Sequence, residues 1–144
     1  MKVPFKPVNY PAVLPYLVVK EVERMMDFMV RAFDGVKIEE IHDRDGNITH
    51  GEIRIDDSVI MIGRETAESP SFRSMIYIYT RDVDAAYERA IKTGAQSIME
   101  PADQYYGDRS GSVQGPFGNY FWIATPIEDV ASEELNRRAK DRIK

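Results

Sequence analysis

The two halves of the chain follow the same order of sequence patterns, and this repetition restricts the possible folds more than any other feature. Leu14 corresponds to Met75 and Met61 to Trp122, and the members of each pair are 61 residues apart. In both halves an apolar run is followed by an amphipathic segment and then by shorter apolar runs. Such a repeat predicts two copies of one supersecondary unit that pack together, because one copy cannot cover both faces of its own sheet.

Hydrophobic periodicity predicts the same elements in both halves. In the first half we expect a strand over 14–19, a helix over 20–33, and strands over 37–42, 48–55 and 59–63. In the second half we expect a strand over 75–79, a helix within 82–95, strands over 97–99, 112–114 and 120–124, and a charged helix over 131–143. The predicted fold class is α+β. Two tandem β-α-β-β-β modules, about 12–65 and about 73–126, form an eight-stranded open barrel-like cleft with the helices outside, in a single domain over 1–144.

Composition excludes several classes of function. The 144 residues include no cysteine, which rules out a disulfide framework, a thiolate zinc site and a cysteine nucleophile. The net charge of −5 argues against a nucleic-acid partner, because phosphate binding depends on clustered Lys and Arg. No apolar run approaches the ~18 residues of a membrane span, and residues 1–11 lack the apolar core of a secretory signal. We therefore expect a cytoplasmic protein that binds neither nucleic acid nor membrane.

Alternation along the predicted strands separates ring-bearing and thioether side chains from aliphatic ones. The face that we expect to line the cleft carries Tyr16, Met61, Met75, Tyr77, Tyr120 and Trp122. Tyrosine and tryptophan bring polar atoms that a closed core leaves without partners, whereas a pocket for a flat or oily molecule uses them. The pattern favours a ligand-binding face; the alternative is that these rings simply fill the barrel.

Polar side chains occur at two further places that can carry chemistry. His50, Glu52 and Arg54 alternate along one strand face, so His50 and Glu52 can share a proton, hold two positions on a metal ion, or orient an anion with Arg54. The alternative is a solvated face with ordinary ion pairs. In the loop expected before the seventh strand, Tyr106 can cover the cleft and Arg109 can bind an anion; the alternative there is a local pair of Asp108 with Arg109.

Four stretches of the chain resemble a known superfamily: LPYLVVKEVERMMDFMVRAF (14–33), THGEIRIDDSVIMIG (49–63), YIYTRDVDAAYERAIKTGA (77–95) and YYGDRSGSVQGPFGNYFWIAT (105–125). They resemble the vicinal oxygen chelate superfamily, which includes glyoxalase I, extradiol dioxygenases and bleomycin-binding proteins, and in particular its PhnB-like branch. The resemblance implies one glyoxalase-like domain with an eight-stranded cleft, and a homodimer.

The resemblance also implies where metal ligands would stand. The superfamily's four ligand positions fall on Leu14, Met61, Met75 and Trp122. None of these side chains offers the carboxylate or imidazole that such divalent ions require. Relatives often carry histidine at three more positions, which here are Pro11, Asn119 and Pro126. We therefore expect no bound metal and no cofactor.

These observations favour a glyoxalase-like protein that lacks the usual metal ligands and binds a small apolar or aromatic molecule. The residues expected to bind it are Tyr16, His50, Glu52, Met61, Met75, Tyr77, Tyr106, Arg109, Tyr120 and Trp122. Any catalytic residue is unknown, with His50 and Glu52 as the candidates. Three alternatives stay open: a metal-dependent lyase or dioxygenase, an enzyme with His50 as base, and a protein-interaction module.

Overall fold

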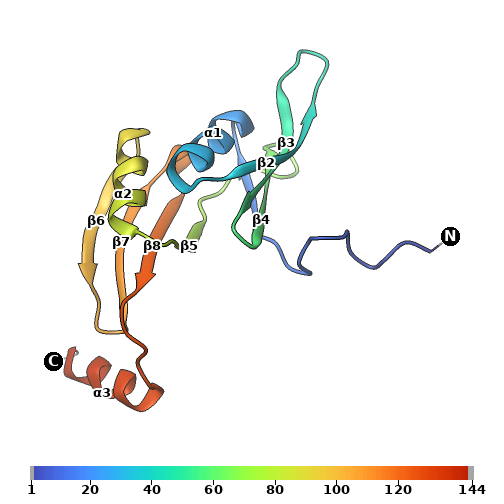
Figure 1. Cartoon of the computed structure of the whole chain (residues 1–144). Coiled ribbons are helices and arrows are strands. Elements are labelled where there is room, and N and C mark those ends of the chain that lie inside the picture. The colour runs from blue at the N-terminus through green and yellow to red at the C-terminus, as the bar shows by residue number, and fades with distance from the viewer. Residues whose placement is uncertain (1, 143–144) are drawn as a thin grey trace. The chain divides into compact units, whose positions relative to one another are not determined.

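The computed structural model describes residues 2–142, and the chain divides into two compact units with their boundary between Ser74 and Met75. Each unit contains one four-stranded sheet and a helix that follows its first strand (Figure 1). The second unit ends in a further helix. None of the helices within residues 2–142 has the length and apolar character needed to cross a membrane.

The first unit has the element order β-α-β-β-β. Strand β1 (Tyr16–Val19) is followed by helix α1 (Val22–Phe33) and by strands β2 (Val36–His42), β3 (Ile48–Ile55) and β4 (Ser58–Arg64). The strand order in the sheet is β1-β4-β3-β2, with β1 parallel to β4 and the other neighbours antiparallel.

The second unit repeats this order. Strand β5 (Met75–Tyr79) is followed by helix α2 (Val83–Lys92), strands β6 (Gln96–Asp103) and β7 (Asp108–Gln114), the short 3-10 helix η1 (Pro116–Gly118), strand β8 (Tyr120–Pro126) and helix α3 (Ser132–Arg142). Its sheet has the order β5-β8-β7-β6, with β5 parallel to β8. The predicted α+β fold of two tandem modules is confirmed. The closure of the two sheets into one cleft stays a prediction.

The strand register also repeats between the units. Tyr16 lies directly opposite Met61 in the first sheet, and Tyr77 lies directly opposite Trp122 in the second. Both pairs obey the 61-residue offset seen in the sequence. The duplication therefore extends from the order of the elements to the individual residues that face each other.

One apolar face of each helix packs on its own sheet. In α1 the buried residues fall at helical spacing and include the whole side chains of Met25, Met26 and Met29, as expected for core methionines. Gly51 on β3 lets α1 approach closely, because a Cβ there would lie 2.2 Å from the Met26 sulfur. The buried face of the sheet thus belongs to the helix, and the other face is left for the site.

The structure corrects the predicted boundaries of β6 and β7. β6 runs to Asp103 and β7 begins at Asp108, whereas the sequence pattern predicted only 97–99 and 112–114 as strands. Pro101 interrupts the pattern, but β6 is an edge strand, where a residue without an N–H is tolerated. A register shift in the β6–β7 pairing between Met99 and Ala102 accommodates it. Asp108 and Arg109 therefore lie in a strand and not in a loop.

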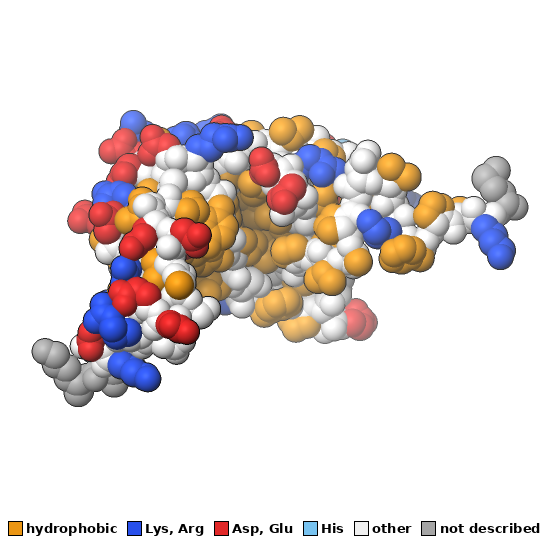
Figure 2. Space-filling model, turned by 60° about the horizontal axis from the view of Figure 1, so that its bottom comes forward, with side chains coloured by type: hydrophobic (Ala, Val, Ile, Leu, Met, Phe, Trp, Pro, Cys, Tyr) orange, Lys and Arg blue, Asp and Glu red, His pale blue; other side chains and the backbone are white. Residues whose placement is uncertain are grey.

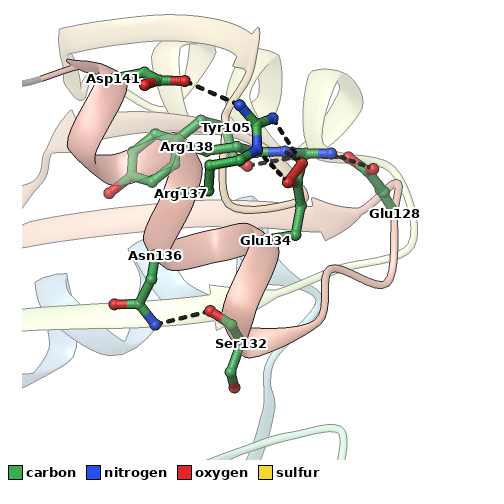
Figure 3. Close-up of polar contacts among 8 residues, drawn as sticks. All are labelled: Tyr105, Glu128, Ser132, Glu134, Asn136, Arg137, Arg138 and Asp141. Carbon is green, nitrogen blue, oxygen red and sulfur yellow. Dashed lines mark hydrogen bonds and ion pairs between the residues drawn. The ribbon is translucent and has the colours of Figure 1, made fainter.

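Helix α3 is attached to the second unit by charged contacts. None of the residues 132–142 is buried, and Figure 2 shows positively and negatively charged side chains intermixed over this helix. The Arg138 guanidinium donates to the Tyr105 carbonyl at 2.9 Å and to the Glu128 carboxylate at 2.8 and 2.9 Å (Figure 3). The Arg142 guanidinium lies 4.5 Å from the centre of the Tyr105 ring. Because these charged groups remain partly exposed to solvent, we expect this attachment to weaken in high salt.

Candidate functional site

The second sheet has one face of aliphatic and phenylalanine side chains and one of rings and hydroxyls. Tyr77, Trp122 and Ser112 are directly paired across β5, β8 and β7, so their side chains share a face. Met75 and Tyr120 form the neighbouring pair on that face, and both are exposed. The opposite face packs with α2 and is formed by Ile76, Ile78, Val113, Phe121 and Ile123. We call the face that carries Tyr77, Ser112 and Trp122 the aromatic face.

Asp108 lies at the edge of the aromatic face and gathers tyrosine hydroxyls. The hydroxyls of Tyr77 and Tyr79 donate to its carboxylate at 2.6 and 3.3 Å. Burial raises the pKa of Tyr77, and the hydrogen bonds to Asp108 and Tyr106 raise it further. Sequence reasoning did not select Asp108 as a site residue. Its alternation with Ser110 and Ser112 is the signal that a correct start for β7 would have revealed.

Two buried polar atoms on the aromatic face lack partners. Neither the Trp122 Nε1 hydrogen nor the Ser112 hydroxyl has a hydrogen-bond partner within residues 2–142. A buried donor left in this way costs about 1–3 kcal/mol. Trp122 and Ser112 are directly paired, so the two residues with unsatisfied polar groups are neighbours on this face.

The first sheet carries a chain of hydrogen bonds on the corresponding face. Tyr16, Met61 and Glu52 are paired across β1, β4 and β3, which places them on one face with His50. His50 Nε2 lies 2.8 Å from Glu52 Oε2, and the Tyr16 hydroxyl lies 3.2 Å from His50 Nδ1. The Tyr10 hydroxyl donates to Glu52 Oε1. The predicted neighbours His50 and Glu52 are therefore in contact. Tyr10 was missed, because its segment has no periodic pattern.

The ionisation state of Glu52 determines which atoms carry the protons in this chain of hydrogen bonds. Glu52 is only 8% exposed, and this burial opposes ionisation. The hydrogen bonds from Tyr10 and His50 outweigh that effect, so the pKa of Glu52 lies below its ordinary value of 4.5. The hydrogen bond to this carboxylate, followed by burial, raises the pKa of Tyr10. An ionised carboxylate can only accept, so His50 Nε2 must carry the hydrogen that it shares with Glu52. In a neutral His50 the other nitrogen, Nδ1, then accepts from the Tyr16 hydroxyl.

Gly63 provides the space for the Tyr16 ring. A Cβ on Gly63 would lie 2.5 Å from the Tyr16 hydroxyl oxygen and 2.8 Å from the ring. Gly63 is also paired directly with His50 across β3 and β4. The absence of a side chain at Gly63 therefore allows the Tyr16 hydroxyl to reach His50.

The structure places Arg109 in ion pairs with two carboxylates and Tyr106 beside the aromatic face. The Arg109 guanidinium bonds the Asp84 carboxylate on α2 with two contacts of 3.0 Å, and that of Asp103 at 3.1 Å. Arg109 alternates with Ser110 along β7 and so lies on the helix side of the sheet, away from the aromatic face. The partners of Arg109 are therefore Asp84 and Asp103, whereas the alternative expected a pair with Asp108. Tyr106 does contact the aromatic face, through its hydroxyl 3.2 Å from the Ser110 hydroxyl.

A surface depression of about 460 Å³ lies elsewhere in the first unit. It is lined by the start of α1 and by β2, β3 and β4, largely with charged side chains of both signs. It includes none of the residues of the hydrogen-bonded chain on the first sheet. Its mixed charge gives no preference for a ligand class.

The donor set for a metal ion is poor. Among residues 2–142, no three His, Asp or Glu side chains are grouped so that they could hold a metal ion. Of the ligand positions that the resemblance implies, Leu14 precedes β1, Met61 lies opposite Tyr16 and Trp122 lies opposite Tyr77. None of these side chains is a carboxylate or an imidazole. His50 and Glu52 are bonded to each other.

Comparison with known proteins agrees with this geometry. The sequence profile of the Glyoxalase/Bleomycin resistance protein/Dioxygenase superfamily matches residues 9–123. The chain belongs to this superfamily. Among its relatives, the protein Mb0911c of Mycobacterium bovis is 32% identical over 136 residues, which cover 87% of this chain and 90% of the relative.

Several solved structures of other proteins share the fold of this chain. The crystal structure of TioX from Micromonospora sp. ML1 has a TM-score of 0.69 and 18% identity, over 80% of this chain and 98% of that one. The PhnB protein from Bacillus cereus has a TM-score of 0.64 and 11% identity, over 80% and 99% of the two chains. At these identities the likeness establishes the fold alone, so function must be argued from the site.

The lowered pKa of Glu52 makes its contribution to stability depend on pH. We expect Glu52→Gln to lower the free energy of unfolding by about 1–3 kcal/mol at neutral pH. A carboxyl group whose pKa is lowered by folding stabilises the folded protein at every pH above its pKa in the unfolded chain. This stabilisation is lost as the pH falls through the pKa of the folded state. The deficit of the variant should therefore shrink below pH 4.5, the ordinary value. Urea unfolding at a series of pH values measures it.

Glu40→Gln is the matched control for this experiment. Glu40 lies on β2 and makes partly exposed ion pairs with Lys37 and His42 at 3.6 and 3.5 Å. Such pairs contribute about 0–1 kcal/mol, so this variant should stay close to the wild type. A Glu52→Gln deficit that does not change with pH would contradict the assignment of an ionised Glu52.

Proposed function

We propose that this protein binds a small planar organic molecule on the aromatic face, without transforming it. The observation that carries the proposal is that Trp122 Nε1 and the Ser112 hydroxyl, next to Tyr77 in the sheet, have no hydrogen-bond partner in the described part of the chain. A ligand with an acceptor atom would satisfy the indole N–H. The surrounding rings would cover its flat surface.

Charge restricts the ligand further. Asp108 is 8% exposed and sits at the edge of the same face, where it accepts from Tyr77 and Tyr79. A buried carboxylate repels an anion across a medium of low dielectric constant. The ligand class that fits is therefore a neutral planar molecule with a carbonyl-type acceptor. The same proposal includes a homodimer, which the resemblance implies, and a cytoplasmic location, which the composition favours.

Coumarin and naphthalene test the proposal as a pair, because both are planar but only coumarin has a carbonyl. We expect coumarin to raise the melting temperature and to change the fluorescence of Trp122, the single tryptophan of the chain. Trp122→Phe removes the indole donor and should weaken coumarin binding about fivefold, the equivalent of one hydrogen bond near 1 kcal/mol. Naphthalene binding should change little. Isothermal calorimetry measures all four affinities.

Tyr87→Phe serves as the control variant. Tyr87 lies on α2 and bonds the Ser97 hydroxyl, so it is not part of the aromatic face. Coumarin affinity in this variant should equal that of the wild type. If coumarin neither raises the melting temperature nor changes the Trp122 fluorescence, or if Trp122→Phe binds it unchanged, the proposal is wrong.

A further inference from the structure

The hydrogen-bonded chain on the first sheet is ordered from a buried charge to an exposed hydroxyl. Glu52 is 8% exposed as a residue, the His50 side chain is 20% exposed, and Tyr16 is 47% exposed. Each link has one donor and one acceptor: His50 Nε2 donates to Glu52, and the Tyr16 hydroxyl donates to His50 Nδ1. This is the arrangement in which a buried carboxylate orients an imidazole that accepts a proton from an outer hydroxyl.

Acidic side chains lie on the strand face that carries His50. Glu52 is in contact with it, and Glu39 on β2 is paired with Glu52 across the strands. Arg54 is the nearest cation along the same strand face, but its guanidinium bonds the Asn9 carbonyl at 3.1 Å instead of Glu52. The Glu52 carboxylate therefore faces the positive charge that His50 would acquire on taking up a proton.

We propose that Tyr16, His50 and Glu52 form an acid–base relay that removes a proton from a neutral carbon acid, with Tyr10 as a positioning residue for Glu52. As the substrate C–H bond breaks, its proton passes to the Tyr16 hydroxyl oxygen, and the Tyr16 hydroxyl proton passes to His50 Nδ1. The electron pair of the broken bond stays on the substrate. The resulting imidazolium is balanced by Glu52 and later returns its proton to the product or to water.

The surroundings determine the substrate class. Met61 lies between Tyr16 and Glu52 in the sheet and gives the substrate an apolar contact. Glu52 and Glu39 disfavour an anionic substrate, which is why the carbon acid is neutral. This relay lies within the first unit and does not depend on ligand binding to the aromatic face.

The probe is 5-nitrobenzisoxazole, a neutral planar carbon acid. Removal of its ring C–H proton sends the electron pair into a nitrile as the N–O bond breaks, and the coloured cyanophenolate is released. We expect the wild-type protein to accelerate this reaction over buffer, and His50→Gln to reduce the acceleration at least ~100-fold, the usual contribution of a general base. A wild-type rate equal to that of buffer overturns the proposal.

His42→Gln is the matched control for His50→Gln. His42 is an exposed histidine on β2 that pairs with Glu40 at 3.5 Å and has no part in the relay. Its substitution should leave the rate unchanged, and an equal loss in both variants overturns the assignment.

Two variants test the outer hydroxyl separately. Tyr16→Phe removes it, and Gly63→Ala displaces it by placing a Cβ 2.5 Å from the Tyr16 oxygen. Because Tyr16 is half exposed and can move outward, we expect Gly63→Ala to fold. Both should lower the rate at least ~10-fold. A wild-type rate in either variant overturns the placement of Tyr16.

Glu52 and Tyr10 are tested by readouts that a merely structural role would not move. Glu52→Gln should shift the acid limb of the pH–rate profile to lower pH, because the imidazolium loses its compensating carboxylate. Tyr10→Phe should move it in the opposite direction, because Glu52 loses a donor that disperses its charge. Nitrogen-15 NMR of the wild type provides a measurement independent of any variant's folding: neutral His50 should carry its proton on Nε2, and a proton on Nδ1 overturns the relay.

Discussion

Replacing Gly107 with alanine should lower the free energy of unfolding by about 2–4 kcal/mol. Gly107 has a φ of 97°, a conformation that strains any residue with a side chain. A Cβ there would also lie 2.6 Å from the Glu128 carbonyl oxygen. The backbone cannot move away, because the Gly107 carbonyl accepts from the N–H groups of Ile127 and Glu128 at 2.8 and 3.1 Å. Since Gly107 directly precedes Asp108, we also expect the Tyr77 hydrogen bond to loosen.

Gly46→Ala separates the effect of the positive φ from the effect of the close contact with the Glu128 carbonyl oxygen. Gly46 has a similar φ of 84°, but nothing lies within 4 Å of a Cβ built on it. It should therefore show only the conformational cost, about 1 kcal/mol. Urea unfolding followed by far-ultraviolet circular dichroism measures both. An equal loss at Gly46 and Gly107 would show that the close contact with Glu128 does not limit this turn.

Phe121→Ala is expected to have the largest effect, a loss of about 3–5 kcal/mol. Phe121 is 0% exposed and lies on the helix side of β8, where the sheet packs with α2. Removing the ring takes away its transfer free energy and leaves a cavity that the packed neighbours fill only in part. We expect this variant to melt at a much lower temperature or to fail to accumulate as folded protein.

Tyr120→Ala is its control on the adjacent position of the same strand. Tyr120 is 38% exposed and belongs to the aromatic face. It should cost about 1 kcal/mol or less, because most surface substitutions fall in that range. Calorimetric melting of the two variants compares the two faces of β8 directly. If Tyr120→Ala is as damaging as Phe121→Ala, the aromatic face is a packed core and cannot be a ligand-binding face.

The order of the elements in each module could be predicted because it depends on local pattern. Met25, Met26 and Met29 recur at helical spacing, and all three are fully buried in α1. The alternation of Phe121 and Trp122 along β8 likewise predicts which side chain faces the helix. The alternation of His50 and Glu52 predicted that they would be neighbours on one face, and they are hydrogen bonded.

The limits of β6 and β7 could not be predicted, because their cause is not local. Pro101 breaks the apolar pattern, yet the edge position of β6 allows the strand to continue past it. The position of Arg109 depends on these limits: the sequence predicted it in a loop, and the structure places it in β7, where it forms ion pairs with Asp84 and Asp103. A shift in where a strand begins decides which residues point to which face.

By itself, the sequence determined the duplication, the fold class of each module and the separation of ring-bearing from aliphatic faces. These follow from spacing within one element or from the 61-residue offset, and both are visible without coordinates. The tertiary structure alone brought Tyr10 to Glu52, 42 residues away, and left Trp122 Nε1 and the Ser112 hydroxyl buried without partners among residues 2–142. Such contacts depend on the register and on side chains meeting across strands, which no local pattern encodes.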